Sequence, residues 1–185
     1  HQPTSESRST YNTATCLKSS YDIVDAVFLA DNQRYVRKDA TLMSNMERIN
    51  RMIAEPFYDL MCAGEVTRAR YVGSRTIDGG DIIASLEGWT AIGLGRTELP
   101  SSRFPWEMRK KSFREKALQS FRGTQALDAT VSDLSLTCDA KDAGKAIYII
   151  SGPEKDLNMD MVKSLSDYIK ELAPAALIRG GDFPG

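Results

Sequence analysis

A long run of helically spaced apolar residues constrains the fold of this chain more than any other feature. The apolar side chains recur every three or four residues and end before Gly64, at Leu42, Met46, Ile49, Met52, Ile53, Phe57, Leu60 and Met61. This spacing predicts one long amphipathic helix, whose apolar stripe must pack against other elements. Because proline inside a helix costs about 3 kcal/mol, we expect Pro56 to bend or divide it.

Shorter segments around this helix alternate between helix and strand patterns. Residues 10–20 fit a short helix, and the apolar run at residues 25–30 predicts a strand buried on both faces. Asp78 and Asn158 are each predicted to cap a helix. A further helix is predicted at residues 106–122, and further strands at 89–95, 134–138, 145–150 and 176–179. Mixed elements without an internal repeat predict an α/β or α+β fold.

The composition argues against several classes of function. Twenty-four basic residues against 25 acidic ones give a net charge of −1, so no overall field attracts nucleic acid or an anionic membrane. No apolar run is long enough to cross a bilayer, and three widely spaced cysteines indicate reduced thiols in the cytoplasm. The only histidine is His1, which argues against a histidine-based metal site or nucleophilic pair. Neither common glycine-rich phosphate-binding motif is present.

Six short motifs occur along the chain in a fixed order. They are Tyr11-Asn12-Thr-Ala, Asp25-Ala-Val-Phe-Leu-Ala-Asp31-Asn32, Ile49-Asn50, Thr76-Ile-Asp78-Gly-Gly-Asp81-Ile-Ile, Ile149-Ile-Ser-Gly-Pro153 and Ile178-Arg-Gly-Gly-Asp-Phe-Pro184. In this order they resemble the tubulin/FtsZ superfamily, and most closely its archaeal tubulin-like CetZ branch. Each motif alone is weak. Their collinear order, spread over nearly the whole chain, is far more specific than any single motif.

The resemblance implies a division of the chain into three parts. Residues 1–35 would end a Rossmann-like GTP-binding half, 36–63 would form the central helix, and 64–185 a smaller domain with a four-stranded mixed sheet packed by helices. We expect Trp89, Ile149 and Leu177 on strands of that one sheet. The glycine-rich loop that holds the phosphates in the family is missing. The chain therefore resembles a fragment or one half of a split protein, with an amino-terminal GTP-binding half as its partner.

Four residues match family positions that contact GTP or GDP. Asn32 and Asn50 match two asparagines that bind guanine, and an amide side chain can present both a donor and an acceptor to a purine edge. Met46 stands where the family has a ring stacked on the base, and Asn12 would lie near the ribose. Without the resemblance, Asn32 is a turn former and Asn50 a polar residue on a helix face. Mg²⁺ is expected to accompany the nucleotide and not to be bound by this chain alone.

Asp78 and Asp81 are the catalytic candidates. From the residues alone, Asp-x-x-Asp is a helix-capping pattern. In the family, the matching loop projects into the GTP site of the next subunit, where acidic residues orient the attacking water. The resemblance assigns this role mainly to Asp81, with Asp78 in support. It implies self-association into protofilaments, with hydrolysis only in the intact, assembled protein and neither tight GTP binding nor turnover by this chain alone.

Two other functions stay open at this point. The chain could be an interaction module that retains the domain without hydrolysing GTP. Alternatively, basic and aromatic residues between Arg103 and Lys116 could bind single-stranded nucleic acid. The resemblance favours the cytoskeletal GTPase over both.

Overall fold

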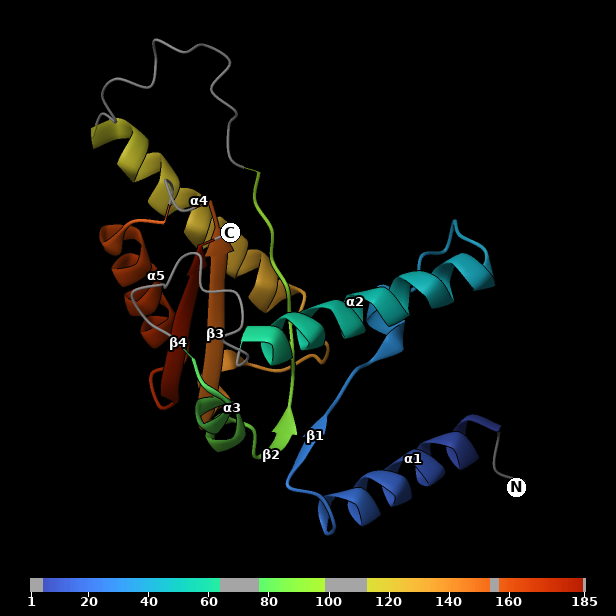
Figure 1. The fold of residues 1–185 in the computed structure, drawn as a ribbon. Coiled ribbons are helices and arrows are strands. Elements are labelled where there is room, and N and C mark those ends of the chain that lie inside the picture. The colour runs from blue at the N-terminus through green and yellow to red at the C-terminus, as the bar shows by residue number, and fades with distance from the viewer. Residues whose placement is uncertain (1–4, 64–76, 99–112, 154–156, 185) are drawn as a thin grey trace.

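The computed structural model describes residues 5–63, 77–98, 113–153 and 157–184, and Figure 1 shows their arrangement. Helices and strands are mixed along these ranges, which confirms the α/β class, and the short 3-10 helices are labelled η. The elements are α1 (Ser5–Tyr21), β1 (Ala26–Phe28), η1 (Asn32–Tyr35), α2 (Leu42–Ala63), α3 (Gly79–Ser85), β2 (Gly88–Thr90), α4 (Phe113–Ser132), η3 (Ala140–Asp142), β3 (Lys145–Gly152), α5 (Met159–Leu172) and β4 (Leu177–Pro184). None of these helices combines the length and the apolar character needed to cross a membrane.

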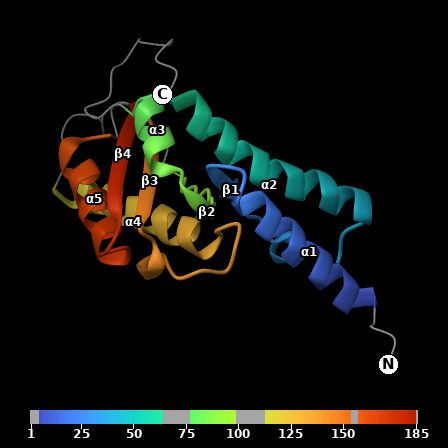
Figure 2. The same ribbon diagram turned by 90° about the horizontal axis from the view of Figure 1, so that it is seen from below.

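The predicted long helix is α2, whose 22 residues form one continuous helix in both views (Figures 1 and 2). Of the predicted apolar stripe, Ile49 and Leu60 are buried, together with Asn45 and Pro56. The other predicted positions that are exposed are Leu42, Met46, Phe57 and Met61, so the buried face is narrower than the sequence predicts. The expected division at Pro56 does not occur. Pro56 is itself buried, and packing of the buried face of α2 against the rest of the fold offsets the lost backbone hydrogen bond.

The strands in the described ranges form two parallel pairs, not the expected four-stranded mixed sheet. β1 pairs with β2, with Val27 opposite Trp89. β3 pairs with β4 over eight residues, from Lys145 opposite Leu177 to Gly152 opposite Pro184. Trp89 therefore lies in a different sheet from Ile149 and Leu177, and the prediction that the three share one sheet was wrong.

The segment after β2 packs closely against α4. The strand predicted for residues 89–95 ends at Thr90, and the chain then turns against α4. A Cβ atom on Gly95 would lie 1.8 Å from the carbonyl oxygen of Ala126, and one on Gly93 would lie 2.7 Å from that of Thr130. These two glycines let the segment after β2 contact the α4 backbone directly.

Residues 134–138 form no strand, contrary to the sequence prediction, because Ser135 replaces a strand ladder with its own hydrogen bonds. Ser135 is 1% exposed. Its N–H donates to Ile92 O at 2.8 Å, and its carbonyl oxygen accepts from Asp31 N at 2.7 Å. Its hydroxyl donates to Leu29 O at 2.5 Å and accepts from Ile92 N at 3.0 Å. One buried serine thus links the segments that follow β1 and β2.

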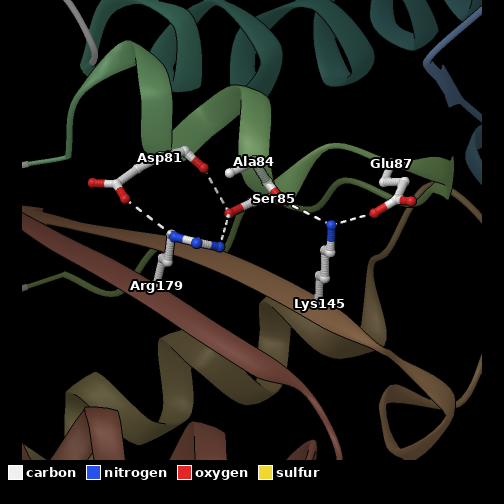
Figure 3. Close-up of polar contacts among 6 residues, drawn as sticks. All are labelled: Asp81, Ala84, Ser85, Glu87, Lys145 and Arg179. Atoms are coloured by element: carbon white, nitrogen blue, oxygen red, sulfur yellow. Dashed lines mark hydrogen bonds and ion pairs between the residues drawn. The ribbon is translucent and has the colours of Figure 1, made fainter.

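The two carboxyl-terminal helices cover one face of the β3–β4 pair, and α3 lies on its other face (Figure 3). α4 continues ten residues beyond the predicted end at residue 122, because Gly123 is an internal packing position against Leu165 and not a helix stop. The predicted start at residue 106 lies outside the described ranges. α5 begins as predicted, with the Asn158 side chain accepting from Met161 N at 2.9 Å.

A small apolar core holds α2, α3 and both strand pairs together. Leu60, Ile77 and Ile82 form its buried centre. The half-buried side chains that pack around this centre are Phe28, Leu86, Ile92, Ile147 and Ile149. Both pairs of strands therefore contribute to one core, and α3 is fixed against the carboxyl-terminal end of α2.

Candidate functional site

The helix α3 begins at the acidic pair that the sequence singles out. Asp78 precedes it in an extended conformation, and its Oδ1 accepts from Asp81 N at 2.7 Å. This bond satisfies one of the free amides at the start of the helix. The capping interpretation is confirmed for Asp78, whose carboxylate is occupied within its own loop.

Asp81 lies in the first turn of α3, and its side chain points toward β4. Its Oδ1 is 3.1 Å from Nε of Arg179, with side-chain exposures of 40% for Asp81 and 28% for Arg179. The other carboxylate oxygen points away from the guanidinium (Figure 3). Asp81 therefore keeps one oxygen oriented by a fixed cation and one oxygen directed elsewhere.

Two cations, one from each long strand, attach α3 to the sheet (Figure 3). Arg179 Nη1 donates to Ser85 Oγ at 3.4 Å, and Ser85 Oγ donates to the carbonyl oxygen of Asp81 at 2.7 Å. At the other end of α3, Lys145 Nζ donates to Ala84 O at 3.0 Å and forms an ion pair with Glu87. The hydrogen bond and charge of Lys145 lower the pKa of Glu87.

Sequence reasoning missed Arg179, Ser85 and Lys145 as partners of the acidic loop. Arg179 belongs to the closing motif at residues 178–184, which was noticed only as part of a resemblance. Its contact with Asp81 depends on the register of β4 and on how α3 lies over the sheet. The one available signal was an arginine directly after the apolar residues that open the strand, since a partly buried guanidinium requires an anionic or carbonyl partner.

The base-binding candidates on α2 share one face. Met46 and Asn50 are four residues apart, so their side chains are neighbours on the helix surface. Each follows a buried residue, Asn45 and Ile49 respectively, and Met46 is 53% exposed. Asn50 is also exposed. Both side chains are thus accessible on the side of α2 next to its buried stripe.

The loop that contains Asn32 is fixed against the same end of α2. Asn45 is buried, and its amide accepts from Arg37 N at 2.8 Å and donates to Arg37 O at 2.9 Å. Arg48 Nη1 donates to Tyr35 O at 2.5 Å. Asn32 opens η1, and the bond from Arg48 places η1 beside the amino-terminal half of α2, which also carries Met46 and Asn50.

Asn12 is not brought to the other three candidates. It is exposed on α1, which lies well apart from α2 in Figure 1. Across the described ranges, no group of three or more histidine, cysteine, aspartate or glutamate side chains is arranged to hold a metal ion.

The acidic loop lies at a different level along α2 from Met46 and Asn50. Leu60, near the carboxyl-terminal end, packs with Ile82 of α3 in the core. At about 1.5 Å of rise per residue, Asn50 and Leu60 are about 15 Å apart along the helix axis. A single copy of the chain therefore does not bring Asp81 to the face that presents Asn50.

Comparison with known proteins gives a consistent family. Residues 39–185 match the family described as "Tubulin-like CetZ, C-terminal domain". The tubulin-like protein CetZ5 of Haloferax volcanii is 27% identical over 183 residues, covering 94% of this chain and 46% of that protein. CetZ1 of the same organism is 24% identical over 187 residues, covering 95% and 47%. The chain thus spans about half the length of the curated relatives it matches.

Solved structures show the same fold. The GDP-bound monomer of CetZ1 from H. volcanii superimposes with a TM-score of 0.71 at 21% identity, covering 94% of this chain and 45% of that one. The GTPgS-bound protofilament of CetZ2 gives 0.67 at 23%, covering 91% and 45%. An empty FtsZ dimer from M. jannaschii gives 0.59 at 18%, covering 91% and 43%. The tubulin/FtsZ-like fold is confirmed, and the chain belongs to the tubulin-like CetZ family, with its C-terminal domain at residues 39–185.

Proposed function

We propose that this chain is the carboxyl-terminal part of a CetZ/FtsZ-type cytoskeletal GTPase that polymerises head to tail and supplies Asp81 to the GTP site of the next subunit. The observation that carries the proposal is the separation of the two sets of residues along α2. A base bound beside Asn50 is about 15 Å along the axis from the level of Leu60 and α3 in the same subunit. A second subunit stacked along this axis would present its own α3 to that nucleotide.

The chemistry of Asp81 suits this role. Phosphoryl transfer is catalysed mainly by placement and electrostatics, so a carboxylate that orients the attacking water is an effective group. Asp81 is partly exposed and uses one oxygen for Arg179, which leaves the other for a water molecule. Asp78 has a different task in this proposal, because its Oδ1 is already engaged with Asp81 N. It holds the first turn of α3 in place.

Guanine recognition in the proposed protein falls to Asn32 and Asn50, with Met46 packed on the base. The GDP-bound and GTPgS-bound relatives support a guanine nucleotide as the ligand. Residues 1–35 would belong to the GTP-binding half and 36–63 to the central helix, leaving 64–185 as the smaller domain. The phosphates and their Mg²⁺ would be held by the partner half, which would contain the glycine-rich loop.

The test is the GTPase rate of the complete protein with Asp81→Asn, measured against protein concentration. We expect GTP binding and assembly to persist while turnover falls by roughly a hundredfold, since an amide cannot replace the carboxylate as acceptor and anion. Glu87→Gln is the matched control, because it removes a carboxylate that is also ion-paired and close to α3. That variant should hydrolyse GTP at nearly the wild-type rate.

Mixing experiments check that the site is shared between subunits. If Asp81 acts in the neighbouring subunit, mixing Asp81→Asn protein with an Asn50→Ala variant that keeps Asp81 should restore turnover, because the second protein supplies Asp81 to the intact GTP site of the first. No gain in turnover on mixing, or near-normal turnover by pure Asp81→Asn protein, would contradict the proposal. Absence of turnover in the wild-type protein would favour the non-hydrolytic interaction module.

A further inference from the structure

We propose that Arg179 is the positioning residue for Asp81, and that its guanidinium sets the direction in which the free carboxylate oxygen points. This inference rests on the proposed function, since it assigns a means of orientation to the same acidic residue. Arg179 would not itself contact the nucleotide. It would act through Asp81, by holding both the side chain and the backbone of that residue.

The geometry supports control of orientation. Arg179 Nε is 3.1 Å from Asp81 Oδ1, and Arg179 Nη1 donates to Ser85 Oγ, which donates to the carbonyl oxygen of Asp81. One planar group thus fixes two points of Asp81, its carboxylate directly and its main chain through one hydroxyl. A guanidinium is suited to this because its donors lie in a rigid fork, unlike the single point charge of lysine.

Arg179 lies on β4, in the longer of the two strand pairs within the described ranges. Arg179 lies opposite Ile147 in the eight-residue register of β3 and β4. α4 and α5 cover the far face of these strands (Figure 3). The guanidinium is therefore carried by a strand of a packed sheet, whereas the carboxylate that it holds lies on a seven-residue helix.

Electrostatics gives a second reason for this pairing. A carboxylate that approaches a triphosphate is repelled by it, and a cation on its far side reduces that repulsion. Arg179 provides the ion pair that the structure shows for Asp81 within the described ranges. An ion pair this exposed adds little to folding stability, so its effect should be seen in turnover and not in the unfolding midpoint.

Lys145 provides an internal control. It attaches the opposite end of α3 to β3 by binding Ala84 O and Glu87, without contact to Asp81 (Figure 3). Lys145→Gln and Arg179→Gln each remove one cation that attaches α3 to the sheet. Only the second removes the group that orients the carboxylate.

The experiment measures kcat per assembled subunit in the complete protein, at concentrations well above the assembly threshold. We expect Arg179→Gln to lower kcat about tenfold or more, with GTP affinity and the urea midpoint nearly unchanged. Arg179→Lys keeps the charge and should recover part of the loss. Lys145→Gln should stay within about twofold of wild type. An equal loss in Lys145→Gln would show that general loosening of α3 is responsible, which would overturn the inference.

A double-mutant cycle separates positioning from an independent role. If Arg179 acts through Asp81, Arg179→Gln should cause no further loss of kcat when Asp81 is already asparagine. Multiplicative losses would refute positioning. Slow turnover by Asp81→Asn with normal turnover by Arg179→Gln would remove this inference and leave the proposed function intact. Normal turnover by Asp81→Asn would remove the proposed function and, with it, any role for Arg179.

Discussion

Replacing Ser135 by alanine should destabilise the chain strongly, although the change removes a single oxygen atom. The hydroxyl donates to Leu29 O at 2.5 Å and accepts from Ile92 N at 3.0 Å, at a position that is 1% exposed. Alanine fits the same space without a cavity larger than that atom. The two main-chain groups would then lose their partner at the point where the segments after β1 and β2 meet.

The expected loss follows from these two bonds. A typical intramolecular hydrogen bond contributes about 0.5–1.5 kcal/mol net, and a buried polar group left unpaired costs about 1–3 kcal/mol. Leu29 and Ile92 are half-buried, so water can compensate part of that cost. We therefore expect Ser135→Ala to lower the free energy of unfolding by about 2 kcal/mol, a large part of the ~5–15 kcal/mol typical of a domain.

Urea denaturation of the chain followed by circular dichroism measures this loss. With an m-value of about 2 kcal/mol/M, the midpoint should fall by about 1 M at unchanged slope. Ser164→Ala is the matched control, because Ser164 is exposed on α5 and should change stability by no more than about 0.5 kcal/mol. If Ser135→Ala behaves like this control, the hydroxyl does not hold the two segments together and our explanation for the absent strand at residues 134–138 fails.

Three further predictions concern stability and use the same urea assay. Gly180→Ala should cost about 1–3 kcal/mol, because its Cβ would lie 2.0 Å from the ring of Tyr148; an unchanged midpoint would show that the ring moves aside freely. Burial raises the pKa of Tyr35, so the fold favours the neutral phenol. The stability that results is fully present below the pKa of the unfolded chain, about 10, and is lost as pH rises through the pKa of the folded chain. Tyr35→Phe should therefore lose less stability than wild type between about pH 8 and about pH 11, and equal losses would contradict this assignment. Asn158→Ala should cost about 1 kcal/mol by removing the cap of α5, whereas Asn158→Asp should not.

Local patterns predicted the elements whose stabilisation is local. The helix α2 and the Asn158 cap of α5 were predicted correctly, because helix periodicity and capping depend on neighbours within a few residues. The alternation at residues 134–138 also looked local, but the hydrogen bonds of Ser135 go to partners far away in sequence. Its role could not be inferred from a short window.

The candidate site divides in the same way. The Asp78 cap was predicted correctly, since a helix cap is visible in sequence, whereas Asp81 was singled out by a collinear motif and its catalytic role stays a prediction. Arg179 was not linked to Asp81, because that contact depends on how β4 pairs with β3 and on where α3 packs on the sheet. The separation of Asn50 from Asp81 likewise depends on which end of α2 contacts α3, and this contact exists only in the folded chain.

Pro56 gives α2 a point of low bending stiffness. A helix resists bending through its ladder of backbone hydrogen bonds, and proline has no N–H to donate to the carbonyl one turn earlier. The missing hydrogen bond lies between the turn that presents Asn50 and the turn that packs on α3 through Leu60. A change of curvature in α2 would therefore concentrate at Pro56. Such a bend would change the angle between the helix segment that carries Asn50 and the segment that contacts α3, and so would reorient the acidic loop relative to the base-binding face.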